Sequence, residues 1–473
     1  MLPNKSDVIL QISNLPSPQG HPILGHLIPF QQGPKHTVLE RWAEECGSIY
    51  RIRLGLTPFV VSSDPHFNAD VLKQRPGGFR RHPKISEILE EIGVYSVFNA
   101  EGERWYEHRK PVAEALNLKK VKSFYPLLVE KAAQLVQQCQ LSSQQQEAVE
   151  VRSLVQRFTL DLTTGIAFGY PLNTLGGEKD ELHDALQLVF PMVNKRMSAA
   201  LPVWRWWKSR SDREFDDALR YIRSSVQGFI DAAKRTLLQG EQEEYQASNF
   251  LEALLLEQRD HNLDETDVFS AVFTLLLAGE DTTANSIAWA LFLLAQIPSI
   301  VEELRDEAKQ VYGEALVPSS IQQYQQLKLA EAVALEVIRL KPTSPQLVLQ
   351  SQSRVEVGGL ELPAGTNVIL QNRIAQVQEK YFSEADAFRP HRWLNEQCPA
   401  GMKHQPEIVR TFGGGARYCP GKHLAMHEMV IVISSICKQF DIQMVEPPNT
   451  IAETYTFTMH PASFRVRLRS IRE

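Results

Sequence analysis

The chain has 473 residues, of which 43% are hydrophobic and 22% charged, and its formal net charge is −6 at pH 7. This is the composition of an ordinary globular protein with a large core, and the length alone predicts two or three domains. The acidic balance gives no overall attraction to nucleic acid, so a nucleic-acid partner is not expected.

The chain contains five cysteines, Cys46, Cys139, Cys398, Cys419 and Cys437. Because their number is odd and no two lie close in sequence, neither a disulfide framework nor a zinc site is expected. The first 20 residues contain no apolar run long enough for a signal peptide or a membrane span. We therefore expect a cytoplasmic protein with at most peripheral membrane contact.

A segment rich in Pro and Gly (residues 1–30) precedes an amphipathic helix predicted around residues 38–46. Residues 49–55 and 58–63 are rich in β-formers and predict a hairpin. Helical periodicity then dominates from about residue 100 to about residue 340. Two polar stretches inside this region, 137–146 and 237–249, are predicted to be exposed loops between helices.

The longest predicted helix runs from about residue 264 to Pro298, with Asp264 or Thr266 as its cap. It would be roughly 45 to 50 Å long. Nearly every face is apolar, which indicates burial or a membrane span. A span is disfavoured because Glu280 and Asp281 would lie at the bilayer centre. The sequence thus predicts a buried central helix with a polar break at its middle.

Beyond a helix that ends near Leu340 come short β-like runs at residues 346–351 and 354–370. An irregular stretch with "FRPHRW" and a glycine-rich loop, "FGGGARYCPG" (residues 412–421), lead to a strong helix over 423–440. Residues 455–461 and 463–469 are predicted to form a closing hairpin. The expected fold class is mainly α with a small β portion.

The glycine-rich loop contains Cys419. Gly413, Gly414 and Gly415 permit positive φ and close backbone approach, and the following helix places its N-terminal dipole near the sulfur. Arg417 adds positive charge, so a thiolate is favoured. A thiolate is a nucleophile or a metal ligand. One sulfur is too few for structural zinc but sufficient as the axial ligand of haem iron.

A cysteine hydrolase stays open on this reasoning, with His423 or His427 as the base for Cys419. No sequence feature places either imidazole beside the sulfur.

The loop is similar to the Phe-x-x-Gly-x-Arg-x-Cys-x-Gly signature of the cytochrome P-450 family, and Ala425 and Glu428 fit the extension of that signature into the next helix. The resemblance implies haem b held between a long central helix and the Cys-bearing loop. It makes Cys419 the axial ligand, packs Phe412 over the sulfur and pairs Arg417 with a haem propionate. The residues it implies for cofactor binding are Cys419, Arg417, Phe412, Gly413, Gly421, Ala425, Trp105 and Arg109.

The stretch "AGEDTT" (residues 278–283) resembles the oxygen-activation motif of the same family. Gly279 would permit a kink or bulge in the buried helix. Asp281 and Thr282 would then form an acid–alcohol pair that holds water and relays protons. The expected catalytic residues are Thr282, Asp281 and Glu280. The alternative is a kink in which the threonine bonds back to the helix and the acids face solvent.

Three further motifs follow the family pattern. "EVIR" provides Glu336 and Arg339, which the resemblance combines with Arg392 of "FRPHRW" into a structural ion-pair network, although His391 replaces the usual Glu. "WYEHR" provides Trp105 and Arg109, which would contact a propionate. An Arg that many members have before "VEVGGLELPAG" is missing, since Leu349 or Gln350 stands there.

Substrate-contacting positions are assigned by family position and by the helical face of Thr282. They are Val94, Phe98, Leu275, Ala278, Leu347, Val348 and Phe457. These side chains predict a hydrophobic pocket that suits a fatty acid, terpenoid or steroid. The aromatic and basic stretch 200–210 would cover this pocket or touch a membrane surface.

Electrons would come from NAD(P)H through a separate ferredoxin or flavodoxin-type partner, because the chain has no Cys set for an iron–sulfur cluster and no room for a flavin domain. A basic surface for that partner would combine Lys119, Lys120, Lys122, Lys422 and Arg410.

The resemblance spans essentially the whole chain. It therefore implies a single domain over residues 1–473, a monomer resembling soluble bacterial members, and monooxygenase activity. A peroxygenase, an isomerase or dehydratase on the same fold, and a non-catalytic haem sensor or carrier are the alternatives.

Overall fold

The computed structural model describes residues 11–170, 172–177, 180–199, 201–239, 247–258, 263–394 and 402–471. Cys398, residues 1–10 of the N-terminal segment and most of the 237–249 stretch lie outside them. The chain divides into two compact units. Unit 1 comprises residues 1–86, 339–387 and 399–419, and unit 2 comprises residues 87–338, 388–398 and 420–473. The single domain stays a prediction.

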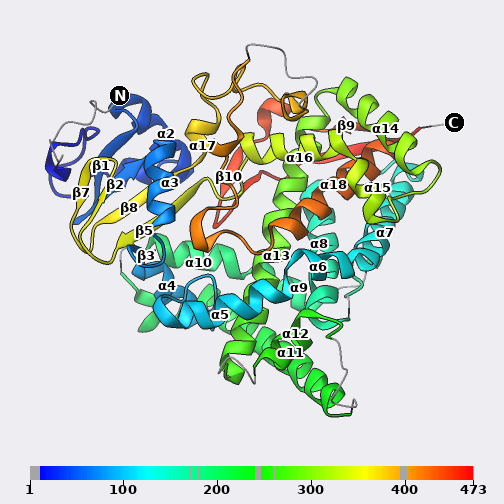
Figure 1. Ribbon diagram of the computed structural model, residues 1–473, viewed down its shortest axis with the longest axis horizontal. Coiled ribbons are helices and arrows are strands. Elements are labelled where there is room, and N and C mark those ends of the chain that lie inside the picture. Colours follow the sequence, from blue (N-terminus) through cyan, green and yellow to red (C-terminus); the bar gives the residue numbers. More distant parts are fainter. Residues whose placement is uncertain are drawn as a thin grey trace. The chain divides into compact units, whose positions relative to one another are not determined.

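Unit 1 contains a five-stranded sheet of order β1-β2-β8-β5-β3 (Figure 1). The predicted hairpin is confirmed, because β1 and β2 pair antiparallel, while β2 pairs parallel with β8. A separate hairpin joins β6 and β7. The elements of unit 1 are η1 (Ile12–Asn14), α1 (Leu27–Phe30), α2 (Lys35–Cys46), β1 (Ile49–Leu54), β2 (Thr57–Ser62), α3 (Pro65–Lys73), β3 (Phe79–Arg81), β5 (Gln346–Ser351), β6 (Val355–Val357), β7 (Leu360–Leu362), β8 (Asn367–Gln371), α17 (Arg373–Gln376), η5 (Pro406–Ile408) and η6 (Gly415–Arg417).

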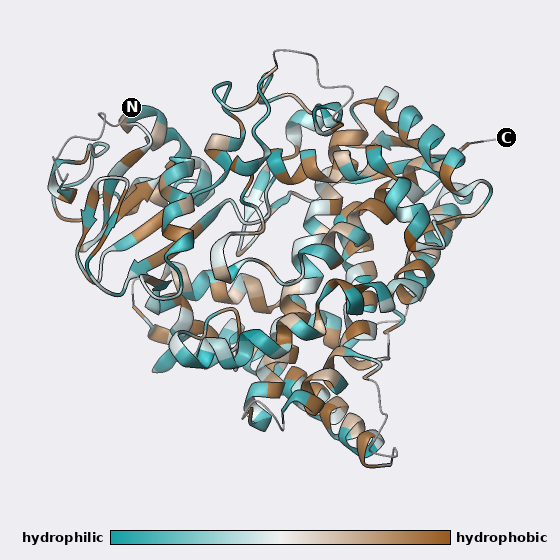
Figure 2. Ribbon diagram, viewed as in Figure 1, coloured by the Kyte–Doolittle hydropathy of each residue, from teal (hydrophilic) through white to brown (hydrophobic). Residues whose placement is uncertain are grey.

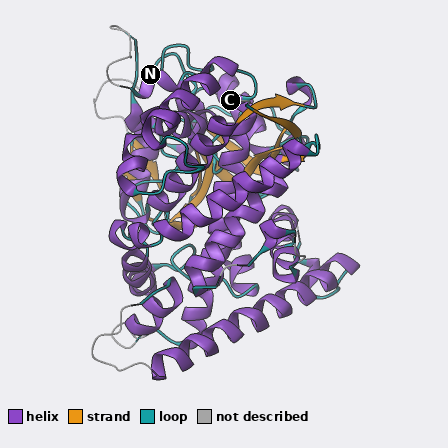
Figure 3. Cartoon of the chain, turned by 90° about the vertical axis from the view of Figure 1, so that its right-hand side faces the viewer, coloured by secondary structure: helices purple, strands orange, loops and turns teal. Residues whose placement is uncertain are grey.

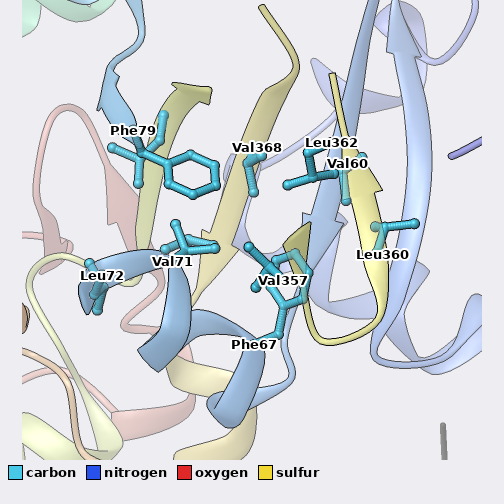
Figure 4. Close-up of a cluster of buried hydrophobic side chains, with 11 residues drawn as sticks. Val60, Phe67, Val71, Leu72, Phe79, Val357, Leu360, Leu362 and Val368 are labelled. Carbon is cyan, nitrogen blue, oxygen red and sulfur yellow. The ribbon is translucent and has the colours of Figure 1, made fainter. Parts of the chain in front are cut away.

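Alternation along the strands builds a core on each face of this sheet. Val60 and Val368 face a cluster that includes Phe67 and Val71 of α3, as Figure 4 shows. The neighbouring strand residues, such as Val61, belong to a second cluster with α2. Successive side chains of a strand point to opposite faces, so a run of β-branched residues serves both clusters. The strands carry brown segments in Figure 2 for this reason.

Unit 2 is mainly helical, and its long helices are seen in Figure 3. Its helices are α5 (Gly102–Ala115), α6 (Leu118–Ser123), α7 (Tyr125–Gln144), α8 (Val151–Phe168), η2 (Thr174–Gly176), α9 (Glu181–Gln187), α10 (Val189–Ser198), η3 (Val203–Arg205), α11 (Arg210–Gln239), α12 (Phe250–Glu257), α13 (Glu265–Leu294), α14 (Pro298–Tyr312), α15 (Ile321–Gln326), η4 (Pro390–Trp393), α18 (Lys422–Gln439) and η7 (Pro448–Thr450). Two helices, α4 (Pro83–Glu91) and α16 (Lys328–Leu340), contain a unit boundary.

The predicted central helix is α13. Asp264 caps it, and Asp267 completes a capping box with Asp264. The helix packs most extensively against α8 and is almost entirely buried. Within the described ranges no single helix is both long and apolar enough to cross a membrane; α13 and α14, bent by 114°, meet the criterion only as a pair.

Two sequence predictions were wrong. The glutamine-rich stretch 137–146 is mostly helical, because α7 continues to Gln144; Gln and Leu are good helix formers and no Gly or Pro interrupts the run. The predicted closing hairpin also divides differently. β10 (Glu453–Tyr455) pairs with β11 (Met459–Pro461), whereas β12 (Arg465–Ser470) pairs with β9 (Phe440–Met444) and β4 (Val149–Glu150).

Candidate active site

Residues 412–419 of the Cys419 loop belong to unit 1, and the backbone conformation of its glycines shapes them. Gly413 and Gly415 have φ of +75° and +63°, in the left-handed region. The Cys419 N–H donates to the Phe412 carbonyl oxygen at 2.9 Å, which closes the loop. A Cβ on Gly415 would lie 2.2 Å from the carbonyl oxygen of Leu72 in α3. Gly415 is therefore required for the contact between the loop and α3.

The middle of α13, in unit 2, has one face that the other described residues leave partly uncovered. Ala278 is exposed, and Thr274 and Thr282, one turn before and after it, are half-buried, in a helix whose other residues are nearly all buried. The Thr282 hydroxyl donates to the Ala278 carbonyl oxygen at 2.7 Å. The sequence placed Ala278 and Thr282 on one face, and the structure leaves only small side chains there.

The helix α13 runs without interruption from Glu265 to Leu294, through Gly279, and a kink at this glycine stays a prediction. Gly279 also allows α8 to approach. A Cβ on Gly279 would lie 2.8 Å from the Thr163 hydroxyl oxygen, and the Thr159 hydroxyl donates to the Glu280 carbonyl oxygen at 2.8 Å. The glycine serves helix–helix packing.

Asp281 is buried and its carboxylate accepts hydrogen bonds from several elements. Arg152 Nη2 of α8 lies 3.1 Å from Oδ1, and Asn285 Nδ2 lies 3.0 Å from Oδ2. The Thr458 hydroxyl, in the turn between β10 and β11, also donates to Oδ2. Gln156 Nε2 adds a longer contact of 3.3 Å. Asp281 thus joins α8, α13 and this turn, and its acid does not face solvent.

Glu280 is separated from Thr282 by two positions, about 200° around the helix, and its side chain is buried. Gln187 of α9 donates to its carboxyl group, and His183 Nδ1 lies 3.5 Å from Oε1. Burial raises the pKa of Glu280 and the charge of Asp281 raises it further, against the lowering effect of His183. Its carboxyl group is directed to α9 rather than to the Thr282 face, and its catalytic role stays a prediction.

Phe98 and Phe457, both expected substrate contacts, lie together in unit 2 with a ring that the sequence did not reveal. The Phe457 ring stacks on Phe190 of α10 with centroids 4.9 Å apart, and lies 6.0 Å from that of Phe98. All three are half-buried. Val94 and Leu275 are buried in unit 2, whereas Leu347 and Val348 pack against the sheet clusters of unit 1.

The Glu336 carboxylate is buried within unit 2 and accepts several hydrogen bonds. It accepts from Arg392 Nε at 3.0 Å, from the Arg389 N–H at 2.9 Å and from Trp393 Nε1 at 2.9 Å. Buried charges of this kind cost much stability when one partner is removed.

Arg339 is buried within unit 1 and donates to the carbonyl oxygens of Gln376, Ala385 and Ala387. Near Glu336, His391 replaces the usual Glu of the family and pairs with Glu303 at 2.7 Å.

Trp105 and Arg109 lie on α5, Trp105 buried and Arg109 half-buried. The helix is anchored to the start of α13, where Asp267 binds Arg104 and lies 3.4 Å from His108. In unit 1, Leu349 lies in the core, and Gln350 accepts from Arg80 Nη2 at 2.7 Å. Arg80 thus lies beside Gln350, one of the two positions at which the expected arginine is missing.

The start of α18 holds Gly421 as its N-cap, and the Ala425 N–H donates to the Gly421 carbonyl at 2.9 Å. His427, one candidate base, is buried between Tyr125 and Tyr324, stacked on Tyr324 with centroids 4.1 Å apart. Burial lowers its pKa. His423 is exposed. This environment gives the hydrolase alternative no support.

Lys119 and Lys122 are exposed on α6, and Lys422 is exposed at the start of α18, which contacts α6. Lys120 donates to the carbonyl oxygen of Ala247 instead. Arg410 is half-buried in unit 1.

The aromatic stretch beginning at residue 201 divides by exposure. Trp204 is buried and binds Glu91 at 2.9 Å, whereas Trp206 and Trp207 are 75% and 71% exposed.

Across the described residues there is no group of three or more His, Cys, Asp or Glu side chains that could hold a metal ion. A lone thiol suits an iron whose other ligands come from a porphyrin. The half-buried Cys419 on a tightly shaped loop fits this role in unit 1. In unit 2 the uncovered Ala278–Thr282 face fits contact with a flat group or its substrate.

A model of the cytochrome P450 family matches residues 15–468. The chain is 27% identical over 424 residues to the protein LUTEIN DEFICIENT 5, chloroplastic, of Arabidopsis thaliana, covering 88% of this chain and 70% of that protein. It is 23% identical to cytochrome P450 97B2, chloroplastic, of Glycine max, covering 89% and 80%. It is 24% identical to 5-epiaristolochene 1,3-dihydroxylase of Nicotiana tabacum, covering 90% and 86%. These relatives are plant proteins and do not support the bacterial-like expectation.

Proposed function

The chain belongs to the cytochrome P450 family and is a P450 monooxygenase, and from this premise we propose that it inserts one oxygen atom from O2 into a hydrophobic small molecule. The observation that carries the proposal is the face of α13 at Ala278 and Thr282. A buried helix that leaves small side chains uncovered beside a bound carboxylate is suited to hold water and substrate there.

Haem b is the proposed cofactor. Cys419 would be its axial ligand, with Phe412, Gly413, Arg417, Gly421, Ala425, Trp105 and Arg109 as its surroundings. When bound, haem supplies the O2-activating chemistry of this family, which an axial thiolate promotes. The protein contributes the loop geometry that fixes the sulfur, and that geometry depends on Gly413 and Gly415.

Thr282 and Asp281 are proposed to hold and deliver protons at the uncovered face. The Thr282 hydroxyl donates to Ala278 and keeps lone pairs that can accept from a water. Asp281 stands next in the chain, and its carboxylate can exchange a hydrogen bond with Arg152, Asn285 or Thr458 for one with water. Glu280 would act at a distance, as a second buried carboxyl group beside Asp281.

The proposed substrates are apolar, of fatty-acid, terpenoid or steroid type, since the rings of Phe98, Phe190 and Phe457 present half-buried apolar surface. NAD(P)H would supply electrons through a separate ferredoxin or flavodoxin-type protein that meets Lys119, Lys122 and Lys422. Trp206 and Trp207 would account for a peripheral membrane contact.

The monomeric state is tested by sedimentation. Cell fractionation tests the cytoplasmic location. Recovery of the protein in a plastid fraction would instead agree with the word chloroplastic in the names of two relatives.

The spectrum of the reduced, carbon monoxide-treated protein tests the cofactor. We expect the red-shifted Soret band of thiolate ligation in the unchanged protein and its loss in Cys419→His. A protein that binds no haem, or one with an imidazole-type spectrum before mutation, would overturn the assignment.

Thr282→Ala tests the proton relay. We expect NAD(P)H-driven product formation to fall at least tenfold relative to O2 consumption, with peroxide-driven turnover retained. Thr282→Ser is the matched control and should keep most of the coupling. Equal loss of both activities would favour a structural role, and peroxide-only activity in the unchanged protein would favour the peroxygenase alternative. An isomerase or dehydratase would turn over substrate without consuming O2. A haem sensor or carrier would bind its ligand without turnover.

A further inference from the structure

Two adjacent residues in the turn between β10 and β11 contact different parts of unit 2. Phe457 joins an aromatic patch, which we define as Phe98, Phe190 and Phe457. Thr458 is 5% exposed and donates from its hydroxyl to Asp281 Oδ2. The turn therefore connects apolar ring surface to the carboxylate of Asp281 through a single peptide unit.

The bond between Thr458 and Asp281 is reinforced by a third side chain. Asn285, one helical turn beyond Asp281, donates from Nδ2 to Asp281 Oδ2 at 3.0 Å and to Thr458 Oγ1 at 3.1 Å. Asn285 is fully buried, so bulk water does not compete for the hydrogen bonds among Asn285, Asp281 and Thr458. A displacement of Thr458 must change the hydrogen bonding of the carboxylate.

The other oxygen of the carboxylate has a separate set of donors. Arg152 lies 3.1 Å from Oδ1 and Gln156 lies 3.3 Å from it, both from α8. Oδ1 is therefore held from α8, and Oδ2 by Asn285 and the turn, while Arg152 Nε also donates to Asn285 Oδ1 at 3.1 Å and so links the two sets. Loss of the Thr458 bond would leave Asp281 attached to α8 and free one acceptor site on Oδ2.

We propose that Thr458 is a positioning residue that couples ligand occupancy of the aromatic patch to the hydrogen bonding of the Asp281 carboxylate. A ligand that packs on Phe457 fixes the turn, and the turn fixes Oδ2. Proton delivery at the Thr282 face then depends on whether substrate is present. The inference rests on the proposed proton-relay role of Asp281.

Thermodynamic linkage makes the proposal measurable without turnover. If the patch influences Asp281, then Asp281 must influence affinity at the patch by the same factor. Asp281 also contacts Gln156, whose Nε2 lies 3.4 Å from Oε1 of Gln187 on α9, so only a comparison with and without the Thr458 hydroxyl assigns an effect of Asp281→Asn to the turn.

The experiment compares two probes that bind the iron of the haem-loaded protein, 4-phenylimidazole and imidazole. Imidazole lacks the phenyl ring, so the ratio of their dissociation constants measures the contribution of whatever apolar surface the phenyl ring contacts, and a fall of this ratio in Phe457→Ala would identify that surface as the aromatic patch. We expect Asp281→Asn to change this ratio by about fivefold or more in the native background. In the Thr458→Val background the same substitution should change it less than about twofold.

Thr458→Ser keeps the hydroxyl and is the matched control, which should preserve the coupling. In turnover, Thr458→Val should lower product formed per O2 consumed, whereas Thr458→Ser should not. An Asp281→Asn effect of equal size in both backgrounds, no effect in either, or no preference for 4-phenylimidazole over imidazole would each overturn the proposal.

The failure of the inference is distinguishable from that of the proposed function. If Thr282→Ala uncouples turnover while the coupling test fails, the proton relay stands and only the link through Thr458 is lost. If Thr282→Ala leaves coupling intact, the relay itself fails. Haem content and thermal unfolding temperature, measured for every variant, separate both results from misfolding.

Discussion

The Cys419 loop and the middle of α13 carry the two halves of the proposed chemistry, and they are shaped by different means. In the loop, backbone conformation decides the geometry: two glycines with positive φ and a main-chain bond from Cys419 to Phe412. In α13, a regular backbone is surrounded by side-chain bonds to Asp281. Substitution of a loop glycine should therefore act through the Cβ that it adds. Substitution around Asp281 should act by removing one of its hydrogen-bond partners.

The largest effect is expected for Gly415→Ala. The new Cβ would meet the Leu72 carbonyl oxygen at 2.2 Å, and alanine disfavours φ of +63°. We expect a loss of more than about 3 kcal/mol in the free energy of unfolding and a strongly reduced haem content, measured by denaturation and by absorbance.

The control for Gly415 is Gly359→Ala, at φ of +77° with no atom within 4 Å of the new Cβ. Strain without a clash should cost only about 1 kcal/mol. Similar losses in both variants would show that φ strain, rather than the contact with α3, decides the geometry of the loop.

A smaller effect is expected for Gly279→Ala. Here the backbone is helical and the clash is with the Thr163 side chain at 2.8 Å, which can shift. We expect a loss of about 1–3 kcal/mol in denaturant unfolding. The double variant Gly279→Ala with Thr163→Ala should recover part of it.

Gly228→Ala in α11 has nothing within 4 Å of the new Cβ and should gain about 0.5–1 kcal/mol. If Gly279→Ala also stabilised the protein, close packing against α8 would not be the reason for this glycine.

The smallest effect concerns pH. The pKa of Glu280 is raised from its ordinary value of 4.5, mainly by burial, so the folded protein holds this proton more tightly than the unfolded chain does. Stability from this group is complete below pH 4.5 and is lost as the pH rises through the raised pKa. His183 acts in the same direction: burial alone lowers its pKa, but Glu280 raises it on balance.

Glu280→Gln cannot ionise, so its unfolding temperature should decline less between pH 5 and pH 8 than that of the unchanged protein. The exposed Glu302→Gln is the control and should leave the decline unchanged. A steeper decline in Glu280→Gln would contradict a buried carboxyl group with a raised pKa.

Much of the fold followed from pattern. The β-formers at 49–63 and the apolar run at 264–298 predicted β1, β2 and α13, because period and capping are local properties. Composition misled at 137–146, where polar residues were assigned to a loop although Gln favours a helix.

The candidate site was predictable where its residues share a motif. Cys419, Thr282 and Asp281 lie in short signatures, but their partners do not. Arg152 and Thr458 reach Asp281 from positions 129 before and 177 after it, and Phe190 reaches Phe457 from another helix. Such contacts are set by how α8, α10 and the β10–β11 turn pack, and no local pattern encodes that packing.

The parallel pairing of β2 with β8 has a consequence for biosynthesis. Asn367 on β8 bonds the carbonyl of Pro58, a residue 309 positions earlier in the chain. Strand β2 emerges from the ribosome long before its neighbour exists, and it must wait with an unpaired edge while unit 2 is largely translated. The sheet of unit 1 is therefore completed late in synthesis.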